Sequence, residues 1–89
     1  MPKTDRTEVY AAIDTELWYQ HTQFGENPHE IDTFATYIRR YSALLDEAVT
    51  SPNPDFIKLA AVRKIAAIAV RCMEQHGAPK RVLGASNGN

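Results

Sequence analysis

The chain has 89 residues, of which 44% are hydrophobic and 24% are charged, a composition typical of one small globular domain. Ten basic and eleven acidic residues leave a formal net charge of −1, which excludes a generally basic binder of long nucleic acids. No apolar run approaches the roughly 18–20 residues of a membrane span. The single Cys72 cannot form an internal disulfide, so the chain suits the reducing cytoplasm.

Apolar periodicity predicts a first helix over residues 7–24, ended by Gly25. Its apolar side chains follow the spacing of three and four that places residues on one face of a helix. We expect this face to lie against the core: Val9, Tyr10, Ile13, Leu17 and Phe24.

A second helix is predicted over residues 28–50. Asn27 can cap it, Pro28 suits its first position because proline lacks the N–H, and Glu30 occupies the capping-box position. Apolar side chains then repeat at alternating steps of three and four, which predicts a continuous core-facing stripe. The stripe comprises Ile31, Phe34, Ile38, Tyr41, Leu45 and Ala48.

Residues 51–55 stop the second helix and start a third, predicted over residues 55–76, with Gly77 as a left-handed C-cap. Two short connections between long helices imply antiparallel neighbours. We therefore expect an all-α, up-down-up three-helix bundle in residues 1–79 and a flexible tail over residues 80–89. The third helix has an apolar arc of on the order of 200°, wider than the roughly 100° that a surface helix needs. We expect a second subunit to cover it, in a homo-oligomer.

Trp18 and Tyr19 are the first candidate binding residues, because they point away from the core face of their own helix. One interpretation is a stacking platform for a nucleotide base, or an anchor at an interface. The other is that the third helix or a neighbouring subunit covers them. Gln20 and His21 lie nearer the core face, where a polar side chain is more often a satisfied buried group than a ligand group.

Arg63 and Arg71 lie on one stripe of the third helix, and Lys64 and Glu74 flank it. Guanidinium groups bind phosphate oxygens through two hydrogen bonds and lysine adds a point charge, so this stripe suits a phosphate. The alternative is a solvated face on which Arg71 and Glu74 pair along the helix. The phosphate hypothesis requires that these cations are neither fully solvated nor neutralised by acids of the chain itself.

His29 and His76 complete the candidate binding residues. His29 lies at the start of the predicted second helix, where N–H groups and the helix dipole favour anions, so it either joins a phosphate site or is plain helix surface. The spacing of the histidines forms no metal motif. Cys72 and His76, one helical turn apart, are half a metal site, and we interpret the pair as structural. We expect no metal and no cofactor.

Several segments of the chain carry a resemblance to a known family: residues 16–20 (Glu-Leu-Trp-Tyr-Gln), His29, residues 62–65 (Val-Arg-Lys-Ile), and residues 70–81, which include Cys-Met-Glu-Gln-His-Gly. Together they resemble a family of small, mostly uncharacterised phage and prophage proteins. The activities assigned in that family tend towards the all-α nucleotide pyrophosphohydrolases of the MazG type. The resemblance covers about residues 8–81 and implies, for a phage protein, the cytoplasm of the host.

Enzymes of that type hold Mg²⁺ with ExxE and ExxD carboxylates on successive helices, and this sequence has neither motif at the corresponding places. Cations stand in the interior of the third helix instead. The leading hypothesis is therefore a phage protein that sequesters a signalling nucleotide of bacterial immunity, as an anti-defence sponge, without cleaving it. Trp18 or Tyr19 would stack the base. Arg63, Lys64 and Arg71 would clamp the phosphates.

Two alternatives remain. One is a Mg²⁺-dependent nucleotide pyrophosphohydrolase that uses Glu16, Glu47 and Glu74, brought together by folding or by oligomerisation. The other is a protein-binding module, such as an inhibitor of a host enzyme. In each case the expected partners include neither a membrane nor a long nucleic acid.

Overall fold

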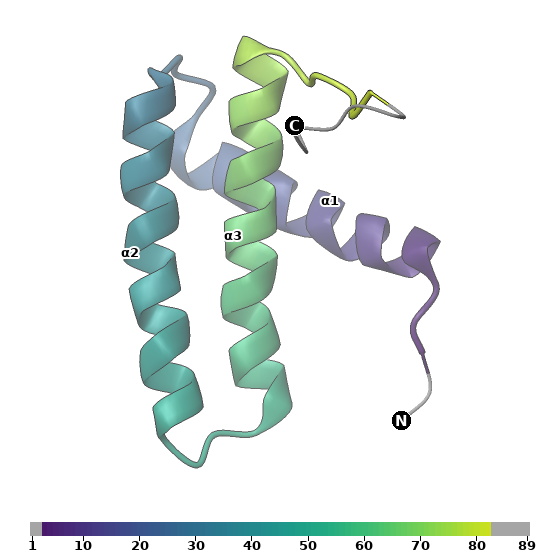
Figure 1. Ribbon diagram of the computed structural model, residues 1–89, viewed down its shortest axis with the longest axis vertical. Helices are drawn as coiled ribbons and strands as arrows, with labels where there is room; N and C mark the ends of the chain where they lie inside the picture. The colour runs from purple at the N-terminus through teal and green to yellow at the C-terminus, as the bar shows by residue number, and fades with distance from the viewer. Residues whose placement is uncertain (1–2, 83–89) are drawn as a thin grey trace.

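The computed structural model describes residues 3–82, and all regular secondary structure in this range is helical. The helices are α1 (Arg6–Phe24), α2 (Ile31–Thr50) and α3 (Asp55–His76). The all-α class is thus confirmed. As expected, α2 and α3 lie side by side and antiparallel, joined by a short turn (Figure 1).

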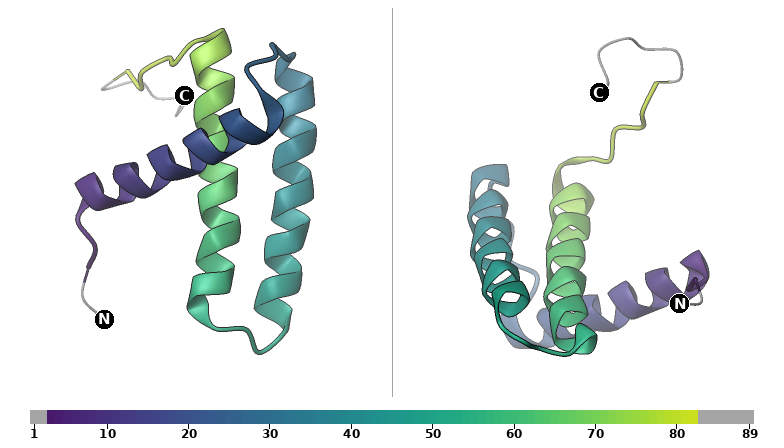
Figure 2. Two further views of the ribbon diagram at one scale, coloured as in Figure 1. Left: turned by 180° about the vertical axis from the view of Figure 1, so that it is seen from behind. Right: turned by 60° about the horizontal axis from the view of Figure 1, so that its bottom comes forward.

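The first helix is arranged differently from an up-down-up bundle. It crosses α3 at a steep inclination, and its N-terminal half projects beyond the α2–α3 pair (Figure 2). α3 packs against both other helices, whereas α1 and α2 make no close backbone approach to each other within the described range. Large apolar residues surround α1 on several sides, so no continuous apolar stripe holds it parallel to the pair.

Two helix ends are held by local hydrogen bonds, at Asp5, which was not among the predicted caps, and at the predicted Gly77. Asp5 caps α1 by accepting a hydrogen bond from the Thr7 N–H at 3.4 Å. α3 ends at Gly77, whose N–H donates to the Met73 carbonyl at 2.8 Å. Gly77 has φ 118° and ψ 156°, a conformation that favours glycine but lies outside the left-handed helical region that we expected.

The start of α2 corrects the predicted cap. The helix begins at Ile31 with Glu30 as its N-cap, three residues later than expected, and the Glu30 side chain makes no capping hydrogen bond. The segment before it is bound to the end of α3 instead. Gln75 accepts from the His29 N–H at 2.9 Å, and its amide donates to the carbonyl of Asn27 at 3.4 Å. These tertiary bonds hold the segment outside the helix.

The core lies between α2 and α3. Phe34 is fully buried from α2, and Ala67 and Ile68 are buried from α3. The residues of the predicted α2 stripe are buried or half-buried, as expected. The exception is Ile31 at its first position, which is 55% exposed. The Phe34 ring meets the rings of Tyr37 and His76 edge to face, with centroids 6.4 and 6.3 Å away.

The predicted core face of α1 is wrong in part. Tyr10 and Phe24 are 62% and 59% exposed, whereas the polar Glu16 and Gln20 are each only 4% exposed. Ile13 and Leu17, from the predicted face, are half-buried beside them. The helix has therefore turned a polar edge towards α3, because α3 presents cations there.

The predicted tail over residues 80–89 lies largely outside the described residues, which end at residue 82. Residues 80–82 are non-helical and exposed. Within residues 3–82, none of the helices has the combined length and apolar character that crossing a membrane requires.

Replacing Phe34 by alanine is expected to lower the free energy of unfolding by about 3–5 kcal/mol, because it opens a cavity in the core. The matched Phe56→Ala change, at a side chain that is 72% exposed, is expected to cost less than about 0.5 kcal/mol. Urea unfolding at one fixed protein concentration measures both. Similar losses for the two variants would contradict the assigned core.

Candidate functional site

One buried carboxylate joins α1 to α3. Glu16 accepts a hydrogen bond from Arg63 Nε at 2.8 Å, and Lys64 Nζ lies 3.7 Å from its second oxygen. That second oxygen also accepts a hydrogen bond from the Gln20 amide at 3.2 Å. Within the described part of the chain, every buried side-chain nitrogen and oxygen has a hydrogen-bond partner. The cluster is therefore a satisfied polar contact at the crossing of the two helices.

The ionised form of Glu16 is favoured by this environment. Burial alone acts to raise the pKa of the Glu16 carboxyl. The hydrogen bonds from Arg63 and Gln20, together with the charges of Lys64 and Arg63, outweigh burial and hold the pKa below its ordinary value. Glu16 is consequently an anion at neutral pH, and Arg63 and Lys64 share its single negative charge.

This arrangement removes two of the predicted phosphate ligands. Arg63 and Lys64 both face an acid of the chain itself, which is the condition under which the phosphate hypothesis fails for them. Lys64 also lies over the Tyr19 ring, with Nζ 5.7 Å from the ring centroid. We conclude that Arg63 and Lys64 bind the carboxylate of Glu16 and so hold α1 against α3, rather than binding the phosphate of a ligand.

Arg71 behaves differently from these two cations. Its Nη1 donates a hydrogen bond to the Gln20 side-chain oxygen at 3.4 Å, and its guanidinium carbon lies 5.8 Å from the Phe34 ring centroid. It makes no ion pair within the described residues, and the expected pairing with Glu74 is not formed. Its positive charge is therefore positioned by neutral groups and is not cancelled by a carboxylate.

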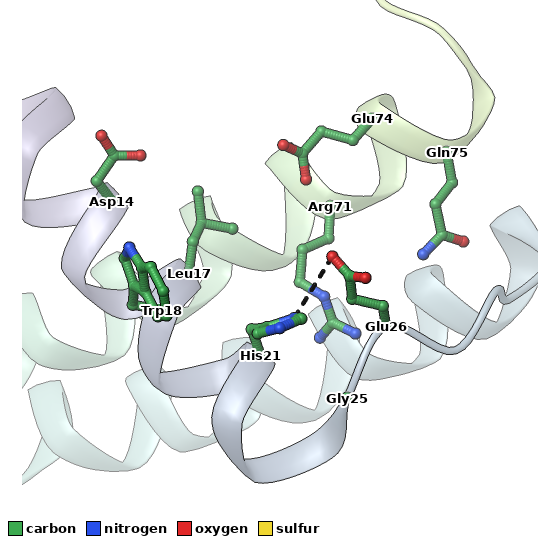
Figure 3. A pocket seen from close by; sticks show the side chains of 9 residues that line it. All are labelled: Asp14, Leu17, Trp18, His21, Gly25, Glu26, Arg71, Glu74 and Gln75. Carbon is green, nitrogen blue, oxygen red and sulfur yellow. Dashed lines mark ion pairs between the residues drawn. The ribbon is translucent and has the colours of Figure 1, made fainter.

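A large hollow opens on one side of Arg71 (Figure 3). It has a volume of about 670 Å³ and lies between the C-terminal half of α1, the start of the following loop and the last turns of α3. Trp18, which is 70% exposed, lines it from α1. The hollow is acidic, since three carboxylates line it against the single guanidinium: Asp14, Glu26 and Glu74.

A smaller hollow of about 260 Å³ lies on the other side of Arg71. Two cations line it, Arg40 from α2 and Arg71 from α3, and no carboxylate does. Arg40, like Arg71, makes no ion pair within the described residues. The remaining lining is mostly aromatic or amide in character: Gln20, Phe24, His29, Tyr37, Tyr41 and Ile68. We call this the cationic pocket.

His29 is fixed at the wall of the cationic pocket by bonds on both sides of its backbone. Its N–H donates to Gln75, and its carbonyl oxygen lies 2.7 Å from Nε2 of His76. Its ring meets the Phe34 and Tyr37 rings edge to face, with centroids 5.6 and 5.8 Å away. His76 therefore contacts the backbone of His29 and lines neither hollow.

The predicted site residues are thus divided. Trp18, Arg71 and Glu74 share the large hollow, while His29 and Arg71 share the cationic pocket. Tyr19 is 54% exposed and lies outside both hollows.

The sequence interpretation missed the contribution of α2 to the cationic pocket. Tyr37, Arg40 and Tyr41 occupy neighbouring positions around one turn of α2. Tyr41 had been assigned wholly to the core. The available signal in the sequence was Arg40 beside Tyr37 and Tyr41 at the edge of the apolar stripe. This signal does not show which of the other two helices packs against these residues.

The carboxylates of the enzyme alternative do not converge within one chain. Glu16 is held by Arg63 and Lys64 at the helix crossing. Glu47 lies near the end of α2 and Glu74 near the end of α3, and these ends are at opposite poles of the antiparallel pair (Figure 1). Among residues 3–82, no group of three or more His, Cys, Asp or Glu side chains is arranged to hold a metal ion.

Comparisons of the chain with protein-family models, with curated proteins and with solved structures find no match. The resemblance to small phage proteins therefore stays a prediction, and the site is interpreted from its own geometry.

Replacing Glu16 by glutamine is expected to lower the free energy of unfolding at pH 7 by about 1–2 kcal/mol, because two partly solvated cations lose their anion. The pKa of Glu16 is lowered by folding, so its contribution is complete above the ordinary glutamate pKa and is lost as the pH falls through the lowered value. Urea unfolding from neutral to acidic pH should show a shallower dependence in the variant. The exposed Glu47→Gln is the control, and an equal loss there would contradict the role of Glu16.

Proposed function

We propose that this protein binds a small anionic ligand of the nucleotide type in the cationic pocket and holds it without cleaving it. The observation that carries the proposal is the pairing of Arg40 and Arg71 in a pocket that no carboxylate lines. Neither guanidinium group is paired with a carboxylate among the described residues, whereas Arg63 and Lys64 share the Glu16 carboxylate.

The chemistry of the pocket suits the two halves of a nucleotide. Guanidinium groups from two different helices can each donate a pair of hydrogen bonds to phosphate oxygens. Phe24, Tyr37 and Tyr41 offer aromatic surface for a base, which stacks with little dependence on sequence. The volume of about 260 Å³ lies near the lower limit of small-molecule sites and favours a single nucleotide unit.

The large hollow is the poorer place for phosphate. Asp14, Glu26 and Glu74 line it and repel an anion, even though Trp18 is available for stacking. The proposal therefore moves the phosphate contact from the predicted Arg63 and Lys64 to Arg40, and keeps only Arg71 of the predicted clamp.

Sequestration of a signalling nucleotide, as a phage anti-defence protein acting in the host cytoplasm, is the biological role that we propose for such binding. A pocket lined by two arginines, with no group of carboxylates converging among residues 3–82, is suited to holding a phosphate ester rather than hydrolysing it. The proposal includes a homo-oligomer, because many large apolar side chains of the described residues are exposed.

A thermal-shift screen tests the proposal. Each member of a panel of mononucleotides and cyclic and linear dinucleotides is added to the protein at high concentration. A ligand present at a hundred times its Kd is expected to stabilise the fold by about 2.7 kcal/mol, which raises the Tm of a domain of this size by about 10–20 °C. Arg40→Ala and Arg71→Ala are each expected to remove most of that shift.

Arg39→Ala is the matched control, since Arg39 is the neighbour of Arg40 on α2 but bonds to Thr36 and does not line the pocket. It should leave the shift unchanged. Phosphorus NMR after incubation with Mg²⁺ should show the bound nucleotide intact, while release of pyrophosphate would favour the enzyme alternative. The absence of any shift across the panel would refute nucleotide binding.

A further inference from the structure

A second apolar stripe runs along the side of α3 that faces away from the core. At 100° per residue its mean direction is about 150° from that of the buried Ala67 and Ile68. In Figure 1 α2 lies on one side of α3, and α1 passes behind α3 with its N-terminal half projecting past it on the other side. We call this the outer stripe: Leu59, Val62, Ala66, Val70 and Met73.

The outer stripe is exposed towards both ends and half-buried between them. Leu59, Val62 and Met73 are 62%, 44% and 45% exposed, and Ala66 and Val70 between them are half-buried. A surface helix of a monomer normally places charged residues on this side. Here all five positions are apolar over about four turns of helix.

The exposed area of the whole chain is larger than that of a folded monomer of its mass. The chain exposes 7153 Å² at a mass of 10.0 kDa, whereas a folded monomer of this mass exposes about 5,200 Å². The nine residues outside the described part would add at most about 1,200 Å² as a fully extended chain, and the rest still exceeds a folded monomer of its own mass by about 1,000 Å². A stable pair of proteins buries about 800 Å² on each partner.

The outer stripe is also symmetric about its centre. Val62 and Val70 lie four residues on either side of Ala66, and Leu59 and Met73 lie seven residues on either side. A two-fold interface requires that if one residue contacts a second, the second contacts the first in return. An antiparallel pair of such stripes meets this requirement without adjustment.

We propose that two copies of this chain pair through their outer stripes, with the α3 helices antiparallel and the two-fold axis at Ala66. Val62 of each copy then lies opposite Val70 of the other, and Leu59 lies opposite Met73. The small Ala66 side chains meet at the axis and let the helices approach to the close end of the usual 8–10 Å separation. None of the residues in this pairing lines either hollow, and the pairing does not depend on nucleotide binding.

Sedimentation equilibrium of the full chain tests the pairing. The wild type is expected to have a mass of about 20 kDa, twice the 10.0 kDa of the chain. Val62→Glu is expected to return it to one chain, because each introduced carboxylate would be buried against Val70 of the other copy without a partner. Val49→Glu, at an exposed valine of α2 outside the stripe, should stay a dimer. A monomeric wild type, or equal dissociation of the two variants, would overturn the proposal.

A cross-link decides the register even if the charged variant does not fold. With the free Cys72 replaced by alanine, Ala66→Cys should form a disulfide between two copies, because facing Cα atoms at the axis fall within the roughly 4–7 Å that the bond needs. Val62→Cys alone should not cross-link, since position 70 faces it. A wild-type dimer in which Ala66→Cys remains uncross-linked under oxidation would refute the antiparallel pairing.

Discussion

The position of one buried anion determines how α1 joins the rest of the molecule. Glu16 is taken out of water at the helix crossing, which is favourable only while Arg63 and Lys64 pair with it. Sliding α1 by one turn would leave the carboxylate unpaired. The same contact decides which cations of α3 can bind a ligand. Arg63 and Lys64 pair with Glu16, whereas Arg71 lines both hollows.

Local patterns were sufficient to predict the helices and half of their packing. The bounds of α3 and the C-terminal ends of α1 and α2 follow from glycine and proline punctuation. The stripe of α2 predicted its core face because only one side of that helix is apolar. The face of α1 could not be predicted in the same way, since its contact with α3 depends on an ion pair between residues 47 positions apart.

The candidate site shows the same limit. Arg71 was identified from its place on α3, but the cationic pocket also needs Arg40, which comes close through the antiparallel pairing of α2 and α3. The charge of a lysine or arginine can be read from a sequence, whereas its neutralisation by a distant carboxylate cannot. For this reason the sequence does not distinguish Arg63 and Lys64 from Arg71, and the structure does, because only the first two pair with Glu16.

The fastening of residues 27–29 to the end of α3 has a consequence for how the chain acquires its shape. The bonds from Gln75 and His76 join residues 46–48 positions apart, the longest loop closures among the bonds that hold this connection. Such closures cost chain entropy until the intervening elements are in place. The hairpin of α2 and α3 can start from the short turn that joins the two helices, so it is placed to assemble first. The first helix would then pack across the hairpin in a later step. The same step would place His29 at the wall of the cationic pocket.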